Sequence, residues 1–144
     1  MFGSLFASKN KKLVDEWVKE HKKMVEFAHK IIDSYEKGDL KTTKKALKSL
    51  NDIAIMHLMK EDLEFYRLLK DEKRADEESQ KLINKFTTSF KDTKATLRDF
   101  LLTYTGENAT LDDKFFQTFK TIVDVLGQRI AFEEKSIYAT LASK

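Results

Sequence analysis

Apolar residues recur along most of the chain at steps of three and four positions, the spacing of one face of an α-helix. Four such stripes predict helices over about residues 10–36, 40–69, 75–104 and 110–141. The first stripe runs through Val14, Trp17, His21, Met24, Ala28, Ile31 and Tyr35. The second runs through Leu50, Ala54, His57, Glu61, Phe65 and Leu68, and the third through Ile83, Phe86, Phe90, Thr93, Leu97, Leu101 and Tyr104. The fourth runs through Phe115, Phe119, Ile122, Leu126, Arg129 or Ile130, Glu133, Ile137 and Leu141.

Short polar stretches separate these helices. Gly38 suits the end of the first helix and Asp39 the cap of the second, and residues 71–74 are predicted to form a polar turn. Residues 110–113 have the form of a capping box that opens the last helix. Long amphipathic helices with short connections predict an all-α fold, an antiparallel up-down-up-down four-helix bundle over residues 10–144.

Residues 1–9 are predicted to form a short N-terminal arm ahead of this bundle. Its apolar side chains, which could pack on the end of the bundle or on a partner, are Phe2, Leu5 and Phe6. The arm lacks a basic segment and is too short to be read as a signal peptide. We therefore expect a cytoplasmic protein.

Four polar side chains stand on the stripes where apolar ones are required, namely His21, His57, Glu61 and Glu133. A buried carboxylate beside a buried imidazole is costly unless both are paired or bound to a metal. His21 lies 17 residues before Gly38 and His57 lies 19 after it. At about 1.5 Å of rise per residue, the two imidazoles are expected at nearly the same height in the bundle.

Two explanations for this polar group stay open. Two imidazoles and two carboxylates are enough ligands for one iron, zinc or manganese ion. Alternatively, the group is a hydrogen-bonded network in which the guanidinium of Arg129 replaces the charge of a metal and pairs with Glu133 or Glu61. Neighbouring Glu134 is expected in solvent, and Tyr138 is expected to pack with its hydroxyl at the bundle edge, although it could donate to an inner carboxylate.

Three motifs resemble the hemerythrin-like (HHE cation-binding) domain family. They are Glu16-Trp17-x-x-Glu20-His21, His57-Leu58-x-Lys60-Glu61-Asp62 and Leu126-x-x-Arg129-Ile130-x-x-Glu133-Glu134-x-x-Ile137-Tyr138. That family is a four-helix bundle that holds two irons between its helices. The resemblance implies a cation-binding function, and the positions that match the family's metal ligands are His21, His57, Glu61 and Glu133.

The sequence departs from the family pattern in two places. Phe86 and Phe90 stand where the third helix usually carries histidine, and Arg129 stands where the fourth helix carries a histidine four residues before its carboxylate. The resemblance therefore implies a reduced or vestigial site that holds one iron rather than two, with zinc, manganese or no metal as alternatives. Sensing or handling of metal, oxygen or nitric oxide would fit such a site.

Two segments of the sequence are also similar to the Rsd/AlgQ regulators, which bind the housekeeping sigma factor. The similar segments are Lys12-Leu13-Val14-Asp15-x-Trp17 and the stretch from Leu126 through Arg129 to Ile137. This resemblance implies the alternative function, a metal-free interaction module with a protein partner.

Composition excludes several other classes. The absence of cysteine rules out disulfides, thiol catalysis and cysteine metal sites. The net charge of +3 is spread over interleaved signs, so no nucleic-acid partner is expected. No apolar run reaches the length of a membrane span. Neither a nucleophile–base pair nor a glycine-rich phosphate loop is present, so we assign no catalytic or organic-cofactor residues and an enzyme is not favoured.

Overall fold

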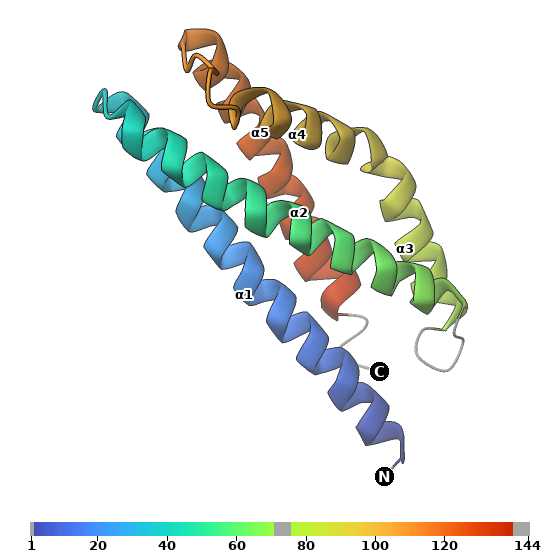
Figure 1. Ribbon diagram of the computed structural model, residues 1–144. Helices are drawn as coiled ribbons and strands as arrows, with labels where there is room; N and C mark the ends of the chain where they lie inside the picture. Colours follow the sequence, from blue (N-terminus) through green and yellow to red (C-terminus); the bar gives the residue numbers. More distant parts are fainter. Residues whose placement is uncertain (1, 71–75, 140–144) are drawn as a thin grey trace.

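The computed structural model describes the backbone of residues 2–70 and 76–139, together with the side chains of residues 10–67, 69–70, 76–88 and 90–139. All regular structure in these ranges is helical, which confirms the all-α class (Figure 1). The elements are α1 (Phe2–Glu36), α2 (Leu40–Lys70), α3 (Glu77–Ser89), α4 (Lys91–Tyr104), α5 (Asp113–Phe132) and the π-helix η1 (Glu133–Tyr138). Within the described residues, no helix is both long and apolar enough to cross a membrane.

Several predictions concern positions outside the described residues. They are the side chains of Phe2, Leu5, Phe6 and Leu68, the turn at residues 71–74, and the end of the last helix near Leu141. Helix α1 begins at Phe2 rather than near residue 10. The backbone of the predicted arm therefore continues the first helix.

The connection between α1 and α2 is a tight turn at Gly38. Gly38 has φ +77°, and its N–H donates to the carbonyl of Tyr35 at 3.0 Å while the N–H of Asp39 donates to the carbonyl of Ser34 at 2.9 Å. The Asp39 carboxylate then accepts the backbone N–H of Thr42 at 3.1 Å. The predicted stop and cap are both confirmed, and they send α2 back along α1 (Figure 1).

The start of α5 differs from the prediction. Asp112 is the N-cap, and its carboxylate accepts the backbone N–H of Phe115 at 2.9 Å. The capping box proposed for residues 110–113 is therefore wrong. Starting the helix later allows Leu111 to enter the core ahead of the cap, and Phe115 follows it as a fully buried residue.

The predicted third helix is divided into α3 and α4 at Phe90, where the helix axis changes direction (Figure 1). Phe90 has φ −107° and ψ 11°, outside the helical region. The segment before it, Thr87-Thr88-Ser89, is poor in helix propensity. The Thr87 hydroxyl also donates to the carbonyl of Ile83 at 2.8 Å, a bond of the kind that bends helices.

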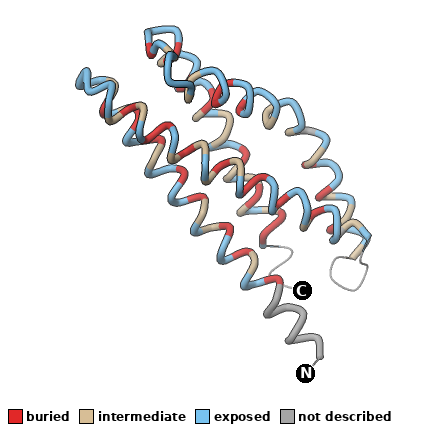
Figure 2. The backbone as a smooth tube through the Cα atoms, in the orientation of Figure 1, coloured by how far each residue is buried: buried red, intermediate tan, exposed pale blue. Residues whose placement is uncertain are grey.

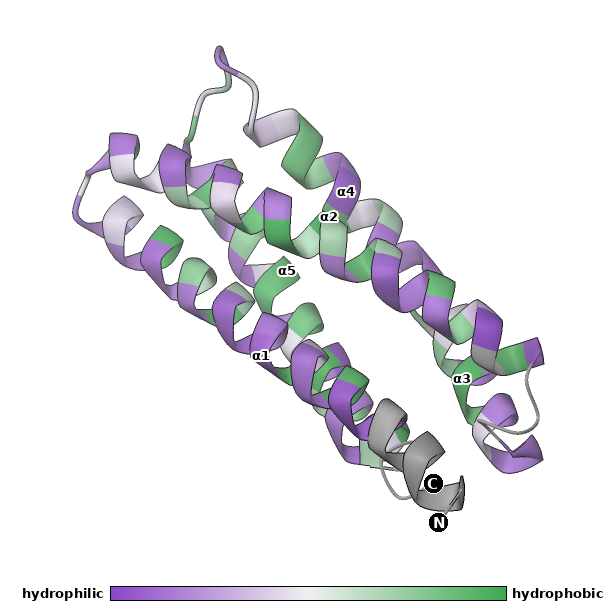
Figure 3. Ribbon diagram, turned by 60° about the horizontal axis from the view of Figure 1, so that its bottom comes forward, coloured by the Kyte–Doolittle hydropathy of each residue, from purple (hydrophilic) through white to green (hydrophobic). Residues whose placement is uncertain are grey.

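Helices α1 and α2 pack along each other, α5 lies against α1 and α4, and η1 contacts α3. The buried positions of the predicted stripes line the inner faces, and polar residues cover the outer ones (Figures 2 and 3). The apolar core is divided into two clusters. The larger one comprises Met24, Ala28, Ile31, Ala46, Leu47, Leu50, Ala54, Leu58, Leu97, Phe100, Leu101, Leu111, Phe115, Phe119 and Ile122. The smaller one, called here the aromatic cluster, comprises Val14, Trp17, Phe65, Ile83, Phe86, Ile137 and Tyr138.

Gly38→Ala is expected to lower the free energy of unfolding by about 1–2 kcal/mol, because a residue with a Cβ is strained at a φ of +77°. Gly127→Ala is the matched control. Gly127 lies inside α5, and a Cβ added there meets no atom within 4 Å. The control should raise the free energy of unfolding by about 0.5–1 kcal/mol. Urea unfolding measures both, and equal shifts in the two variants would contradict the turn geometry.

Candidate metal centre

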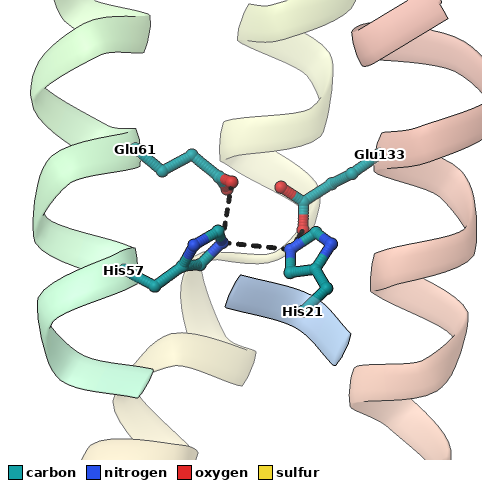
Figure 4. A group of neighbouring side chains, drawn as sticks. All are labelled: His21, His57, Glu61 and Glu133. Atoms are coloured by element: carbon teal, nitrogen blue, oxygen red, sulfur yellow. Dashed lines mark hydrogen bonds and ion pairs between the residues drawn. The ribbon is translucent and has the colours of Figure 1, made fainter. Parts of the chain in front are cut away.

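The four polar residues singled out from the stripes meet between the two apolar clusters. His21 comes from α1, His57 and Glu61 come from α2, and Glu133 begins η1. Each is at most 2% exposed, and their side chains point toward one another (Figure 4). One potential ligand atom from each residue can be chosen so that all four atoms lie within 4.8 Å of one another. The expected matching height of the two histidines is therefore observed.

The two imidazoles are oriented by carboxylates outside this group. His21 Nδ1 lies 3.3 Å from a Glu134 oxygen, and His57 Nδ1 lies 3.1 Å from a Glu20 oxygen. An ionised carboxylate only accepts hydrogen bonds, so we assign a proton to each Nδ1. Both Nε2 atoms then face inward, 3.0 Å apart. Carboxylate–histidine pairs of this kind orient the histidines of metal sites.

Two unprotonated nitrogens 3.0 Å apart repel, so a cation is needed beside them. Without a metal, that cation is a proton. Burial would lower the pKa of His57, but hydrogen bonds and charges from Glu61 and Glu20 outweigh burial and raise it. Burial and the neighbouring His57 lower the pKa of His21. The proton therefore resides on His57 Nε2, which lies 3.0 Å from Glu61 Oε2.

Glu61 and Glu133 each face Arg129 with one oxygen and Tyr138 with the other. Arg129 Nη2 donates to Glu61 Oε1 and Arg129 Nε to Glu133 Oε1, both at 3.2 Å. Tyr138 Oη lies 2.5 Å from Glu61 Oε2 and 3.0 Å from Glu133 Oε2. Burial and the charge of Glu61 raise the pKa of Glu133 well above its ordinary value. Burial opposes ionisation of Glu61, but hydrogen bonds from Glu133 and His57 lower its pKa, so Glu133 holds the proton and Glu61 the charge.

Arg129 is fixed in place by aromatic rings as well as by carboxylates. Its guanidinium carbon lies 5.0 Å from the centre of the Phe86 ring and 5.9 Å from that of Phe90, within the range of cation–π attraction. Arg129 was predicted to pair with Glu133 or Glu61, and it pairs with both. The two phenylalanines that stand at the expected ligand positions of the third helix therefore cover a cation.

Residues 12–141 match the Hemerythrin HHE cation binding domain. The chain belongs to this hemerythrin HHE family. Comparisons with curated proteins and with solved structures give no match. The predicted family is thus confirmed, and its description is that of a cation-binding domain.

This hemerythrin HHE domain also uses three residues that the stripes did not predict for the site. Glu134, expected in solvent, is 37% exposed at its side chain and contacts His21, while Glu20 contacts His57. Tyr138 is 1% exposed, and its hydroxyl is at the centre rather than the edge. In the sequence, Glu20 directly precedes His21 and Glu134 directly follows Glu133. This adjacency is the signal that could have placed both carboxylates at the site. No periodic signal marked the hydroxyl of Tyr138.

The π-helix explains why Tyr138 was missed. Glu133 and Tyr138 are five residues apart, and on an α-helix such residues point about 140° away from each other. A π-helix bonds residues five apart, which places them on one face. The N–H of Glu133 donates to the carbonyls of Arg129 and Ile130, four and three residues earlier, at the junction between α5 and η1. A sequence pattern based on 3.6 residues per turn cannot place both side chains in one site.

The donor set fits a metal ion. Two ligand atoms that each lie about 2.0–2.1 Å from an ion are about 3 Å apart at a right angle and about 3.4 Å apart at a tetrahedral angle. The two Nε2 atoms are 3.0 Å apart, and His57 Nε2 is 3.0 Å from Glu61 Oε2. A carboxylate oxygen of Glu133 lies within 4.8 Å of a donor atom of each of the other three residues. Small side-chain adjustments would therefore give these atoms coordination distances, with imidazole nitrogens and carboxylate oxygens as donors suited to iron, manganese or zinc.

Arg129→Met is expected to lower the free energy of unfolding of the metal-free protein by about 3–5 kcal/mol, because Glu61 and Glu133 would stay buried without their guanidinium. Arg98→Met removes an exposed arginine on α4 and should change the free energy by less than about 0.5 kcal/mol. Chemical unfolding followed by the fluorescence of buried Trp17 compares the two. An Arg129→Met variant as stable as the Arg98→Met control would contradict a structural role for the guanidinium.

Proposed function

We propose that this hemerythrin HHE domain binds a single transition-metal ion, iron before zinc or manganese, and serves in sensing or handling metal, oxygen or nitric oxide. The proposed ligands are His21, His57, Glu61 and Glu133. The observation that carries the proposal is the facing pair of Nε2 atoms, 3.0 Å apart, on rings whose Nδ1 atoms are already committed to outer carboxylates. Such a pair offers two nitrogen lone pairs to one ion.

The proposed domain spans residues 10–144 as an antiparallel up-down-up-down bundle. Its four rods would be α1, α2, α3 with α4, and α5 with η1. The packing of α1 on α2, of α2 on α3 and α4, of α4 on α5, and of α5 on α1 supports this arrangement. The metal would then lie on the bundle axis, between the large core and the aromatic cluster.

One ion is proposed because each of the two carboxylates already gives one of its oxygens to Arg129. The Oε1 atoms of Glu61 and Glu133 bind Arg129, which leaves their Oε2 atoms beside His57 and Tyr138. A second ion would have to displace the guanidinium, which is covered by Phe86. Reversible oxygen carriage needs a complete two-iron site, so we assign sensing or handling in its place.

Metal titration tests the proposal. Chelator-treated protein is expected to bind one equivalent of ferrous ion under anaerobic conditions, as measured by elemental analysis after desalting. His57→Ala should weaken binding by more than about 100-fold, beyond the effect of losing an outer partner. His29→Ala is the matched control, because His29 is exposed on α1. Protein that retains no iron, zinc or manganese would refute the proposed function, and two equivalents would refute the single-ion site.

Metal affinity is expected to rise with pH. The pKa values of His57 and Glu133 are both raised, so each group keeps a proton to a higher pH than usual, in a position that the ion needs. Metal binding releases these protons. Below the pKa of each group, the apparent association constant should rise about tenfold per pH unit for each proton released. Calorimetry in buffers of different ionisation enthalpy counts the protons, and an affinity that is constant from about pH 6 to about pH 8 would contradict the protonation assignment.

A metal-free interaction module, such as a sigma-factor-binding regulator, is the second candidate. It is favoured by a stripe on the outer face of α2 whose side chains are more than half exposed, namely Met56, Met59, Leu63 and Tyr66. Exposed methionines are common on adaptable binding surfaces. Failure to bind metal, together with retention of RNA polymerase components by the wild-type chain but not by Met59→Glu, would favour this function over the first.

A further inference from the structure

The hydroxyl of Tyr138 lies among the proposed ligand atoms rather than beside them. It is 2.5 Å from Glu61 Oε2, 3.0 Å from Glu133 Oε2 and 3.4 Å from His21 Nε2. These distances are of the same size as those between the two Nε2 atoms and between His57 Nε2 and Glu61 Oε2. An ion held by the imidazoles and carboxylates would therefore have this oxygen within reach.

We infer that Tyr138 is a fifth ligand of the centre and that its phenolate oxygen binds the ion when the ion is ferric iron. The inference rests on the proposed metal-binding function. Phenolate is an anionic oxygen donor, and tyrosinate is an established iron ligand in other proteins. Coordination forms an iron–oxygen bond and breaks the phenol O–H bond, and the proton passes to the solvent.

The ring of Tyr138 is held in the orientation that coordination requires. It is fully buried, lies 5.6 Å from the His21 ring at an interplanar angle of 14°, and lies 5.3 Å from the Trp17 ring. The ring cannot swing out without opening the aromatic cluster. The π-helix contributes as well, because it places Tyr138 on the same face as Glu133, five residues earlier.

Charge also distinguishes a ferric ion from a divalent one. A divalent ion beside the two carboxylates and the guanidinium of Arg129 leaves the centre with one net positive charge, and a ferric ion leaves two. A phenolate supplies a third negative charge, which matches the additional charge of ferric iron. Arg129 faces the Oε1 atoms of the carboxylates, whereas Tyr138 faces their Oε2 atoms. The phenolate of Tyr138 would therefore supply its charge on the side of the carboxylates that lies toward the Nε2 atoms of His21 and His57.

Absorption spectroscopy of ferric protein tests this inference. Metal-free wild-type protein is loaded with one equivalent of ferric nitrilotriacetate and desalted. A phenolate-to-iron charge-transfer band is expected in the visible region, with tyrosinate vibrations in the resonance Raman spectrum. Tyr138→Phe should keep the buried ring and bound iron but lose the band. Tyr35→Phe is the matched control and should keep it, because the Tyr35 hydroxyl contacts Asp113 at the far end of α1.

The outcomes separate this inference from the proposed function. Bound ferric iron without a visible band, or an unchanged band in Tyr138→Phe, would overturn the tyrosinate ligand and leave the metal site standing. Failure of the wild-type chain to bind any iron would overturn both. If Tyr138→Phe does not fold, wild-type protein made with ring-deuterated tyrosine decides the question. Shifted Raman bands would show a tyrosinate ligand, which the contacts of its hydroxyl with Glu61 and Glu133 assign to Tyr138, and unshifted bands would refute it.

Discussion

Glu61 and Glu133 are two buried carboxylates whose negative charge must be compensated. The other residues of the centre provide this compensation. Both side chains are almost fully excluded from solvent, and their oxygens share the partners Arg129 and Tyr138. Two such anions coexist only if positive charge or protons compensate them. Arg129 compensates them on one side, and the protonated or metal-bound imidazoles compensate them on the other. Loss of either cation would leave buried charge that water cannot reach.

The apolar clusters on each side of this layer keep water out and so strengthen each of its charge interactions. Trp17, Phe65 and Phe86 close the layer at one end, and residues of the larger core close it at the other. The network reaches solvent through its outer carboxylates. Glu134 is partly exposed beside His21, and exposed Lys60 pairs with Glu20, which in turn holds His57. The two imidazoles are therefore the groups of the centre that these contacts connect to solvent.

Periodicity predicted the helices and most of the inner face, because burial of one face governs both. Ile31, Phe119 and Ile137 are buried as their stripes require, and the polar members of the stripes meet in one layer. Features that interrupt the helical period were not predictable in this way. Tyr138 reaches the centre because η1 changes the number of residues per turn, and Phe90 ends α3 where the Thr87 hydroxyl bonds back to the preceding turn. Both features depend on local backbone geometry, about which the periodicity of the side chains carries no information.

The sequence posed a choice between a metal ion and Arg129 as the partner of the carboxylates, and the geometry is compatible with both partners at once. Each carboxylate has two oxygens, and the guanidinium takes one from each. The remaining oxygens, with the two Nε2 atoms, are enough for one ion. A guanidinium neither exchanges nor changes its oxidation state. In the proposed function, Arg129 therefore makes one of two neighbouring cation positions permanent, and any exchange or redox change is confined to the position beside His21 and His57.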